Sequence, residues 1–159
     1  MDFETLYRRY APDVYRFALF LCGRPEQADD IAAETFVRAW TSPEPIRVGT
    51  VKAYLFTIAR NLYRADVRKN ARHEELADMV DRAAPGPEAS SIARLDLHRV
   101  LEQLQQLPEV DRTVLLMRAE NGMSYEEIAA ALGISIGAAK VKAHRARARL
   151  AEMQRQEEP

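Results

Sequence analysis

Apolar side chains recur at every third or fourth position along most of this 159-residue chain, and that spacing is typical of amphipathic helices. In the first half, Gly23 can end one helix and Pro25 suits the first turn of the next. Two prolines and a glycine in residues 41–50 predict a loop, after which Thr50 can cap a third helix. The predicted helices cover residues 2–22, 25–40 and 51–72.

The second half returns to the helical spacing after a segment that interrupts it. Residues 74–91 contain a Pro-Gly-Pro sequence and more acids than bases, which predicts a linker. Beyond the linker, Ser124 and Glu127 have the spacing of a capping box, and Gly133 separates the last two helices. The predicted helices here cover residues 92–106, 108–120, 124–132 and 135–153.

These elements predict an all-α protein with two small helical domains, residues 1–73 and 92–155, joined by a flexible acidic linker over residues 74–91. No strand pattern and no internal repeat occurs along the chain. A hydrophobic content of 47% and a charged content of 30% are typical of a soluble, folded protein. The C-terminal domain ends in a helix-turn-helix pattern.

The composition excludes several classes of protein. The single cysteine, Cys22, cannot form a disulfide framework or a cysteine-based metal site, and the three histidines lack ligand spacing. No apolar run approaches the roughly 18–20 residues that span a bilayer, and the amphipathic N-terminus does not resemble a signal peptide. We therefore expect a cytoplasmic protein that is not inserted in a membrane. We expect no cofactor, no metal and no small-molecule substrate.

The formal net charge of −1 conceals a sorted distribution. Residues 1–72 carry 12 basic and 9 acidic side chains, residues 73–120 carry 5 and 10, and residues 121–159 carry 6 and 5. Basic helices therefore flank an acidic middle. This pattern favours two surfaces that meet one kind of polyanion, joined by a segment that avoids it.

The last two predicted helices have the spacing of a helix-turn-helix over residues 125–144. Residues 133–150 contain five basic side chains and no acid. Small side chains let such a helix lie deep in a major groove, while Arg and Lys reach base edges and phosphates. A solvated basic helix and a structural corner of two helices stay open as alternatives. The outward face and its boundary hold Ala138, Lys140, Val141, His144, Arg145, Arg147 and Ala148.

The third predicted helix combines cations with aromatic rings. Arg60, Arg64 and Arg68 are four residues apart, which places them on one face. The rings interleaved with them are Tyr54, Phe56 and Tyr63. Cations for phosphates and rings for stacking together suit single-stranded nucleic acid. The first two rings can equally belong to the core, and the basic stripe can serve solubility alone.

Three stretches, taken in order, resemble one protein family. They are DDIAAETFVRAW at residues 29–40, YLFTIARNLYRADVR at residues 54–68, and LPEVDRTVLLMRAENGMSYEEIAAALGISIGAAKVKAHRARARL at residues 107–150. Together they resemble a bacterial RNA polymerase sigma factor of the sigma-70 family. The lack of an extra domain between the two halves is similar to the extracytoplasmic-function subgroup. The resemblance extends over about residues 3–150.

The resemblance implies two roles for the first domain. The second helix would bind core RNA polymerase, through or with the support of Asp30, Glu34, Thr35, Phe36, Arg38 and Trp40. The loop and third helix would capture a flipped base of the −10 strand, which requires a pocket with cationic walls. The candidates for that strand are Arg47, Lys52, Tyr54, Arg60, Asn61, Arg64 and Arg68.

By the same resemblance, the last helix would bind the −35 duplex. Its candidates are Lys140, Val141, Lys142, His144, Arg145 and Arg147. The family's usual threonine is Ala138 here, so recognition depends more on Arg145 and on DNA shape. The implied partners are core RNA polymerase, promoter DNA and an anti-sigma protein that covers the same surfaces. The acidic linker is similar to linkers that enter the active-centre and RNA-exit channel of the polymerase.

Two other functions compete with a sigma factor. A stand-alone helix-turn-helix regulator would use its first domain for dimerisation or sensing, but such a domain does not need a basic, aromatic helix. An enzyme acting on nucleic acid would need a nucleophile or a metal cluster. Asp29, Asp30 and Glu34 share a helix with no histidine, which is weak support for one.

Overall fold

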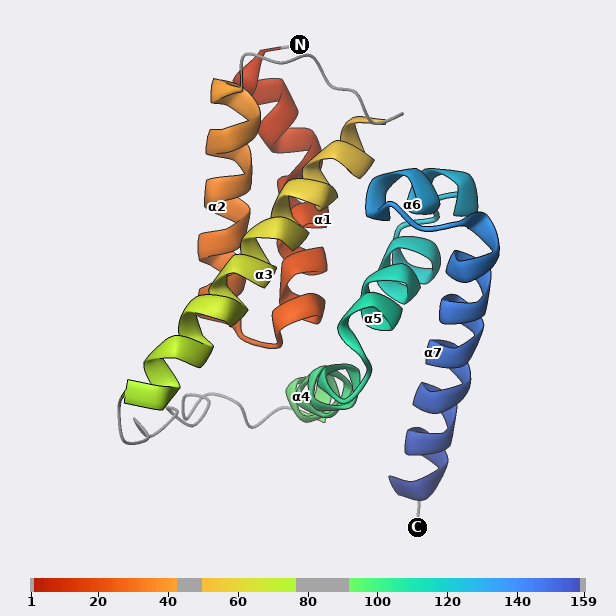
Figure 1. Ribbon diagram of the computed structural model, residues 1–159. Helices are drawn as coiled ribbons and strands as arrows, with labels where there is room; N and C mark the ends of the chain where they lie inside the picture. Colours follow the sequence, from red (N-terminus) through yellow and green to blue (C-terminus); the bar gives the residue numbers. More distant parts are fainter. Residues whose placement is uncertain (1, 43–49, 77–91, 158–159) are drawn as a thin grey trace.

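The computed structural model describes residues 2–42, 50–76 and 92–157, and all regular structure in these ranges is helical, which confirms the all-α prediction. Three helices form an N-terminal group and the others a C-terminal group (Figure 1). The N-terminal helices are α1 (Phe3–Cys22), α2 (Pro25–Thr41) and α3 (Val51–Leu76). The C-terminal elements are α4 (Ile92–Gln105), α5 (Glu109–Leu115), η1 (Leu116–Glu120), α6 (Tyr125–Leu132) and α7 (Ile136–Glu157).

The N-terminal group packs its three helices around an aromatic core. The rings of Phe17 on α1 and Phe56 on α3 stack with centroids 4.3 Å apart, and both side chains are fully buried. Leu21, Leu55 and Phe36 complete this centre. Phe56 is thus a core residue, and its alternative role in stacking on nucleic acid is wrong, because no face of its ring reaches solvent.

The ends of α1 and α3 follow their predicted caps. Gly23 ends α1 in a left-handed conformation with φ of 77°, and Thr50 accepts a hydrogen bond from the backbone N–H of Ala53 at 3.1 Å. Helix α3 continues to Leu76, four residues beyond the predicted end. Most of the predicted linker, residues 77–91, lies outside the described residues.

The helix-turn-helix also begins as its sequence predicts. The Ser124 hydroxyl accepts from the backbone N–H of Glu127 at 3.1 Å, and the Ser124 N–H donates to the Glu127 carboxylate, which completes the capping box. Gly133 breaks the chain between α6 and α7 with φ of 66°. Ser135 caps α7 by accepting from the N–H of Ala138 at 3.0 Å.

The prediction of one regular helix over residues 108–120 is only partly right. The α-helical part ends at Leu115, and the chain continues in a wider π-helical turn, η1. The Asn121 side chain donates to the carbonyl of Leu116 at 2.9 Å, and the N–H of Met123 donates to the carbonyl of Met117 at 3.1 Å. These bonds satisfy carbonyl groups that a widened last turn leaves without regular partners.

The two helical groups are in direct contact, with α3 beside α6 and α1 beside α4 (Figure 1). The Gln105 side-chain amide donates to the carbonyls of Phe20 and Leu21 at 3.3 and 3.2 Å, so it caps the end of α1 from the other domain. A β-carbon at Gly23 would lie 3.1 Å from Gln105, which adds a packing reason for glycine at this turn.

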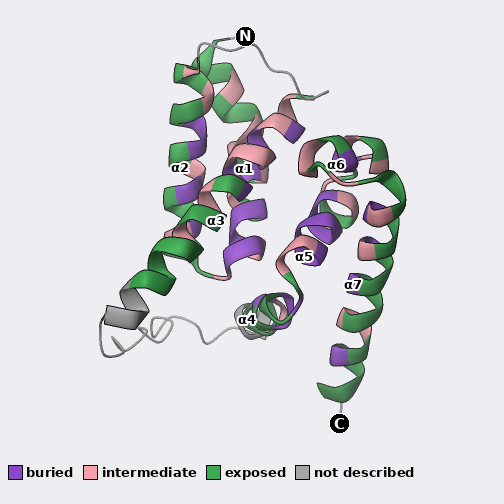
Figure 2. Ribbon diagram, in the orientation of Figure 1, coloured by how far each residue is buried: buried purple, intermediate pink, exposed green. Residues whose placement is uncertain are grey.

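Arg112 of α5 anchors the interface between the groups. It is 3% exposed, and it donates to the carbonyl of Leu107 at 3.0 Å and to the Tyr63 hydroxyl at 2.8 Å. Tyr63 therefore contacts the C-terminal domain in this arrangement rather than presenting its hydroxyl to solvent. Figure 2 shows buried positions concentrated where helices face one another, with the outer face of α7 exposed. No helix in the described ranges is both long and apolar enough to cross a lipid bilayer.

Candidate nucleic-acid interface

Helix α7 buries a stripe of small side chains and exposes its basic face. Ala139, Ala143 and Ala146 are buried against the neighbouring helices, whereas Val141 is 59% exposed. This arrangement matches the faces that the sequence predicts. Of the six candidates for duplex contact, the exposed ones are Lys140, Val141, His144, Arg145 and Arg147. Lys142 is only partly exposed, because it lies on the side of α7 that faces α5.

Asp111 of α5 forms an ion pair with Arg145 of α7. Asp111 accepts from Nε of Arg145 at 2.7 Å and from Nη2 at 2.9 Å, in a two-pronged ion pair. The Lys142 amine lies 3.8 Å from the same carboxylate. The hydrogen bonds that Arg145 donates to Asp111, and then the negative charge of that carboxylate, raise the pKa of Arg145.

The aromatic ring of Tyr125 supports another part of this surface. The Arg118 guanidinium lies 4.5 Å from the centroid of that ring, and the Lys140 amine lies 6.0 Å from it. These are cation–π distances. Tyr125 thus links η1, α6 and the first turns of α7.

Some candidates for contact with single-stranded DNA are exposed, and others are already paired within the protein. Asn61, Arg64 and Arg68 are exposed along α3, and Tyr54 is half-buried. Lys52 is paired with Asp13 of α1 at 3.2 Å and is partly buried. The remaining candidate, Arg47, lies outside the described residues.

Arg60 departs from the expected exposed stripe. Its side chain is 10% exposed, and it donates from Nε and Nη2 to the Glu109 carboxylate of α5 at 2.8 and 3.0 Å. Glu109 is 49 residues away in the chain, in the other domain. In this arrangement Arg60 is therefore not presented together with Arg64 and Arg68. A ligand could reach it only after the two domains separate.

A second surface follows the outer side of α2. Asp30, Glu34 and Arg38 are exposed, and Arg38 donates to the Glu34 carboxylate at 3.2 Å. Thr35 is an exception, because it is fully buried and its hydroxyl donates to the carbonyl of Ile31 at 2.7 Å. Thr35 is thus not presented to a partner on this surface, and of the two roles expected for it, support of the exposed residues is the one that its burial allows. A shallow groove between α2 and α3 is lined by Asp30, Ile31, Ala33, Glu34, Val37, Leu62 and Asp66.

Large apolar side chains continue this surface toward the start of α1. Trp40 is 55% exposed and Val37 is 51% exposed. The Trp40 ring meets the ring of Phe3 edge to face at 5.4 Å, and Tyr7 meets Phe36 in the same way at 5.1 Å. Exposed aromatic rings beside an arginine are typical of a surface that binds another protein. The sequence reasoning missed the contribution of α1 to it.

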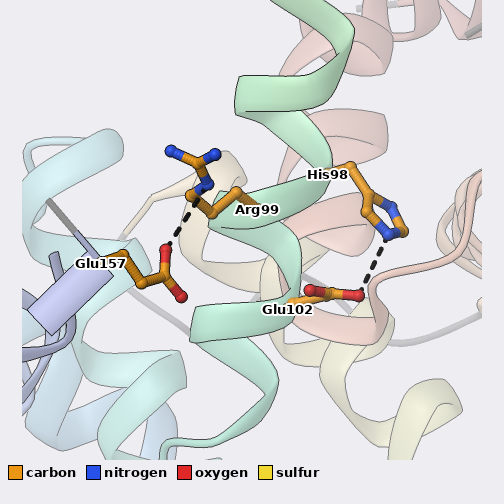
Figure 3. A pocket seen from close by; sticks show the side chains of 4 residues that line it. All are labelled: His98, Arg99, Glu102 and Glu157. Carbon is orange, nitrogen blue, oxygen red and sulfur yellow. Dashed lines mark ion pairs between the residues drawn. The ribbon is translucent and has the colours of Figure 1, made fainter. Parts of the chain in front are cut away.

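A polar pocket between α4 and the end of α7 is occupied by its own ion pairs (Figure 3). His98 lies 3.0 Å from Glu102, and Arg99 lies 3.5 Å from Glu157. The contact between Arg99 and Glu157 attaches the end of α7 to α4, whereas the other lies within α4, and we assign both a structural role. In the described ranges, no group of three or more His, Cys, Asp and Glu side chains is placed to hold a metal ion.

Sequence reasoning missed Asp111 and Glu109. Both acids begin a strongly apolar helix, where a negative charge near the N-terminus has a sufficient local explanation. One signal did exist for Asp111, because it lies just before the apolar run of residues 114–117, and an acid that is buried with such a run requires a cationic partner. The identity of that partner depends on the packing of α5 against α7, which the sequence pattern does not specify.

Comparisons with known proteins agree with this two-part arrangement. Residues 6–73 match the family model for sigma-70 region 2, and residues 97–150 match the one for sigma-70 region 4. The chain is 34% identical over 143 residues to the ECF RNA polymerase sigma factor EcfG of Rhodopseudomonas palustris, which covers 89% of this chain and 79% of that protein. It is 36% identical over 147 residues to the ECF sigma factor SigL of Mycobacterium tuberculosis, covering 89% and 82%.

Solved structures show the same fold. The sigma factor RpoE of Bartonella quintana, in complex with the anti-sigma factor NepR, has a TM-score of 0.81 and 29% identity and covers 99% of both chains. The structure of CnrH in complex with the cytosolic domain of CnrY has a TM-score of 0.76 and 29% identity, covering 98% of this chain and 89% of that one.

Proposed function

This chain belongs to the extracytoplasmic-function subgroup of the sigma-70 family, and we propose that it directs core RNA polymerase to its promoters by using three separate surfaces. The observation that carries the proposal is their placement. One basic helix face, on α7, suits a duplex, and a second, on α3, suits an opened strand. A third surface, on α2, suits a protein. We propose domain limits of residues 1–73 and 92–155, with the linker over 74–91 between them.

The −35 element is the target that we assign to α7. The middle of its exposed face carries only small side chains, because Val141 and Ala148 lie between the flanking cations. A helix with small outward residues can approach the base edges, and its cations can reach phosphates on both sides. Lys140, His144 and Arg147 lie on one flank and Arg145 on the other.

The −10 strand is the target that we assign to the exposed part of α3. Asn61, Arg64 and Arg68 supply donors for phosphates and base edges, and the half-buried Tyr54 lies toward the start of the same helix. Strand opening is costly, so a protein that holds an unpaired strand must supply several such contacts at once.

Core RNA polymerase is the partner that we assign to the α2 surface. Glu34→Ala should weaken the binding of core polymerase, whereas Asp29→Ala serves as a matched control because it removes the same charge from another side of α2. An increase in the dissociation constant for Glu34→Ala but not for Asp29→Ala supports this surface. Equal behaviour of the two variants would contradict it.

An anti-sigma protein is a further proposed partner. Two solved relatives with the same fold are complexes with NepR, named as an anti-sigma factor, and with the cytosolic domain of CnrY. Sigma factors of this family are non-enzymatic initiation factors, and we propose the same for this chain. We place its action in the cytoplasm because core polymerase and promoter DNA are there.

Run-off transcription on a library of upstream sequences tests the function. Purified core polymerase should give promoter-specific transcripts only when this chain is added. Arg145→Ala should change the preferred −35 sequence, whereas Arg64→Ala should impair opening without changing −35 affinity. A chain that binds a specific duplex tightly by itself, and never directs core polymerase, would instead be the stand-alone helix-turn-helix regulator.

A further inference from the structure

Among the described residues of the C-terminal domain, Asp111 is the one acid that is both buried and paired with cations of α7. Its side chain is 2% exposed, although a carboxylate in such a position loses nearly all of its hydration. The compensation comes from α7, where Arg145 supplies two charge-assisted hydrogen bonds and Lys142 supplies a nearby positive charge. Asp111 belongs to none of the three surfaces proposed above for DNA and polymerase binding.

The geometry of the ion pair determines which part of Arg145 is left for a ligand. A guanidinium has five N–H donors in one plane. Asp111 takes one from Nε and one from Nη2, which lie along one edge of that plane. The remaining donors, on Nη1 and on the outer side of Nη2, lie at the end of the side chain. The Arg145 side chain is 57% exposed, so this end reaches solvent.

Two donors at the end of a guanidinium match the two acceptors of guanine in the major groove. O6 and N7 of guanine accept such a pair, and this is the commonest specific contact between an arginine and DNA. A free arginine must lose several rotamers before it can make this contact, whereas one already held by a carboxylate has lost them in advance. The ion pair also fixes the guanidinium beside α5, while more than half of the side chain remains exposed.

We propose that Asp111 is a positioning residue for −35 recognition, holding Arg145 so that Nη1 and the outer side of Nη2 meet a guanine in the major groove. This proposal rests on the proposed sigma-factor function and deepens it. Asp111 touches no base itself, because it lies buried between α5 and α7. Lys142, which is only partly exposed, adds charge near the phosphates and carries no base preference.

A purely structural role for Asp111 gives a different expectation. If the ion pair only joined α5 to α7, replacing Asp111 would lower the stability of the domain and weaken all duplexes equally. A positioning role instead changes the ratio between two DNA sequences. That ratio is measured with one protein preparation, so it does not depend on the fraction of the variant that is folded.

The test uses the full chain in holoenzyme with core RNA polymerase. Promoter templates carry each of the four base pairs at each −35 position, and competition binding gives the preference at each position. The variants are Asp111→Asn, Arg145→Ala, the double variant, and Glu126→Gln. Asp111→Asn keeps the shape of the side chain but removes its charge. Glu126→Gln is the matched control, because it removes one exposed acid from the same helix-turn-helix.

We expect the wild type to prefer guanine at one position by about 5- to 150-fold, the range that a good bidentate contact provides. Arg145→Ala should abolish that preference, and Asp111→Asn should reduce it by at least about threefold at the same position alone, because the guanidinium is then no longer fixed. In the double variant the loss should equal that of Arg145→Ala. Glu126→Gln should leave the ratio unchanged.

Three results would overturn the proposal. One is an unchanged guanine preference in Asp111→Asn. Another is an unchanged preference in Arg145→Ala, since Arg145 would then read no base. A wild-type holoenzyme with no sequence preference at −35 would remove the sigma-factor function itself, and with it the role of Asp111.

Discussion

The ion pair between Arg60 and Glu109 should determine how firmly the two domains are held together. Its two hydrogen bonds, at 2.8 and 3.0 Å, join α3 to α5 across the domain interface. Hydrogen bonds that involve a charged group contribute about 1.5–3 kcal/mol. Glu109 is 25% exposed, so solvent screening favours the lower part of that range. Glu109→Gln should therefore shift the equilibrium toward separated domains by about 10- to 30-fold, the equivalent of about 1.5–2 kcal/mol.

Spin labels on exposed positions of α3 and α7 can measure this shift. Pulsed electron resonance between labels at Lys69→Cys and Gln154→Cys, with Cys22→Ser as background, gives the fraction of molecules with the domains together. Glu102→Gln is the matched control, because Glu102 pairs with His98 in an exposed contact within α4.

A double-mutant cycle isolates the pair itself. Glu109 also lies in the first turn of α5, where loss of a carboxylate costs about 0.3–1 kcal/mol regardless of Arg60. The cycle with Arg60→Gln removes that contribution. Additive effects of the two substitutions, or equal distance distributions for Glu109→Gln and Glu102→Gln, would refute the reasoning.

Three further predictions concern the N-terminal core. Phe56→Ala should lower the free energy of unfolding by about 3–5 kcal/mol, because it removes one of two fully buried stacked rings. Phe3→Ala, at the exposed start of α1, should lower it by less than about 1 kcal/mol. Denaturant unfolding followed by circular dichroism measures both, and equal losses would contradict the packing. Burial raises the pKa of the Cys22 thiol above its ordinary value of 9.0, so the unfolded chain loses this proton first and the thiol should lower stability only above about pH 9. The thiol should also resist a disulfide reagent in the native protein at pH 8 and react on unfolding; rapid reaction of the native chain would show that Cys22 is accessible.

Much of the fold could be predicted because the signals that specify it are local. The capping box of Ser124 and Glu127, the glycine at position 23 and the cap at Thr50 each depend on residues within one turn of the helix that they begin or end. Their chemistry is complete in the sequence itself. The resemblance to sigma factors, which the matches to sigma-70 regions 2 and 4 confirm, assigned the two halves of the chain.

The contacts between distant segments could not be predicted in the same way. The exposed stripe expected on α3 loses Arg60, because this part of α3 packs against the other domain and Arg60 pairs there with Glu109 of α5. Thr35 lies in the core beside the buried Phe36, although the charged polymerase-binding candidates on α2 are exposed. Asp111 acquires its role only when α5 packs against α7. Each of these outcomes depends on which helix faces which, and that information comes from tertiary packing.

The account depends most on the claim that this chain makes core polymerase open promoter DNA. Permanganate reactivity of the −10 thymines, on a promoter selected by transcription, measures that opening directly. Holoenzyme with the wild-type chain should make these thymines reactive, core polymerase alone should not, and Arg64→Ala should reduce the reactivity while Lys69→Ala, a cation on another side of α3, leaves it unchanged. Bound holoenzyme whose −10 thymines stay unreactive with the wild-type chain would contradict the account.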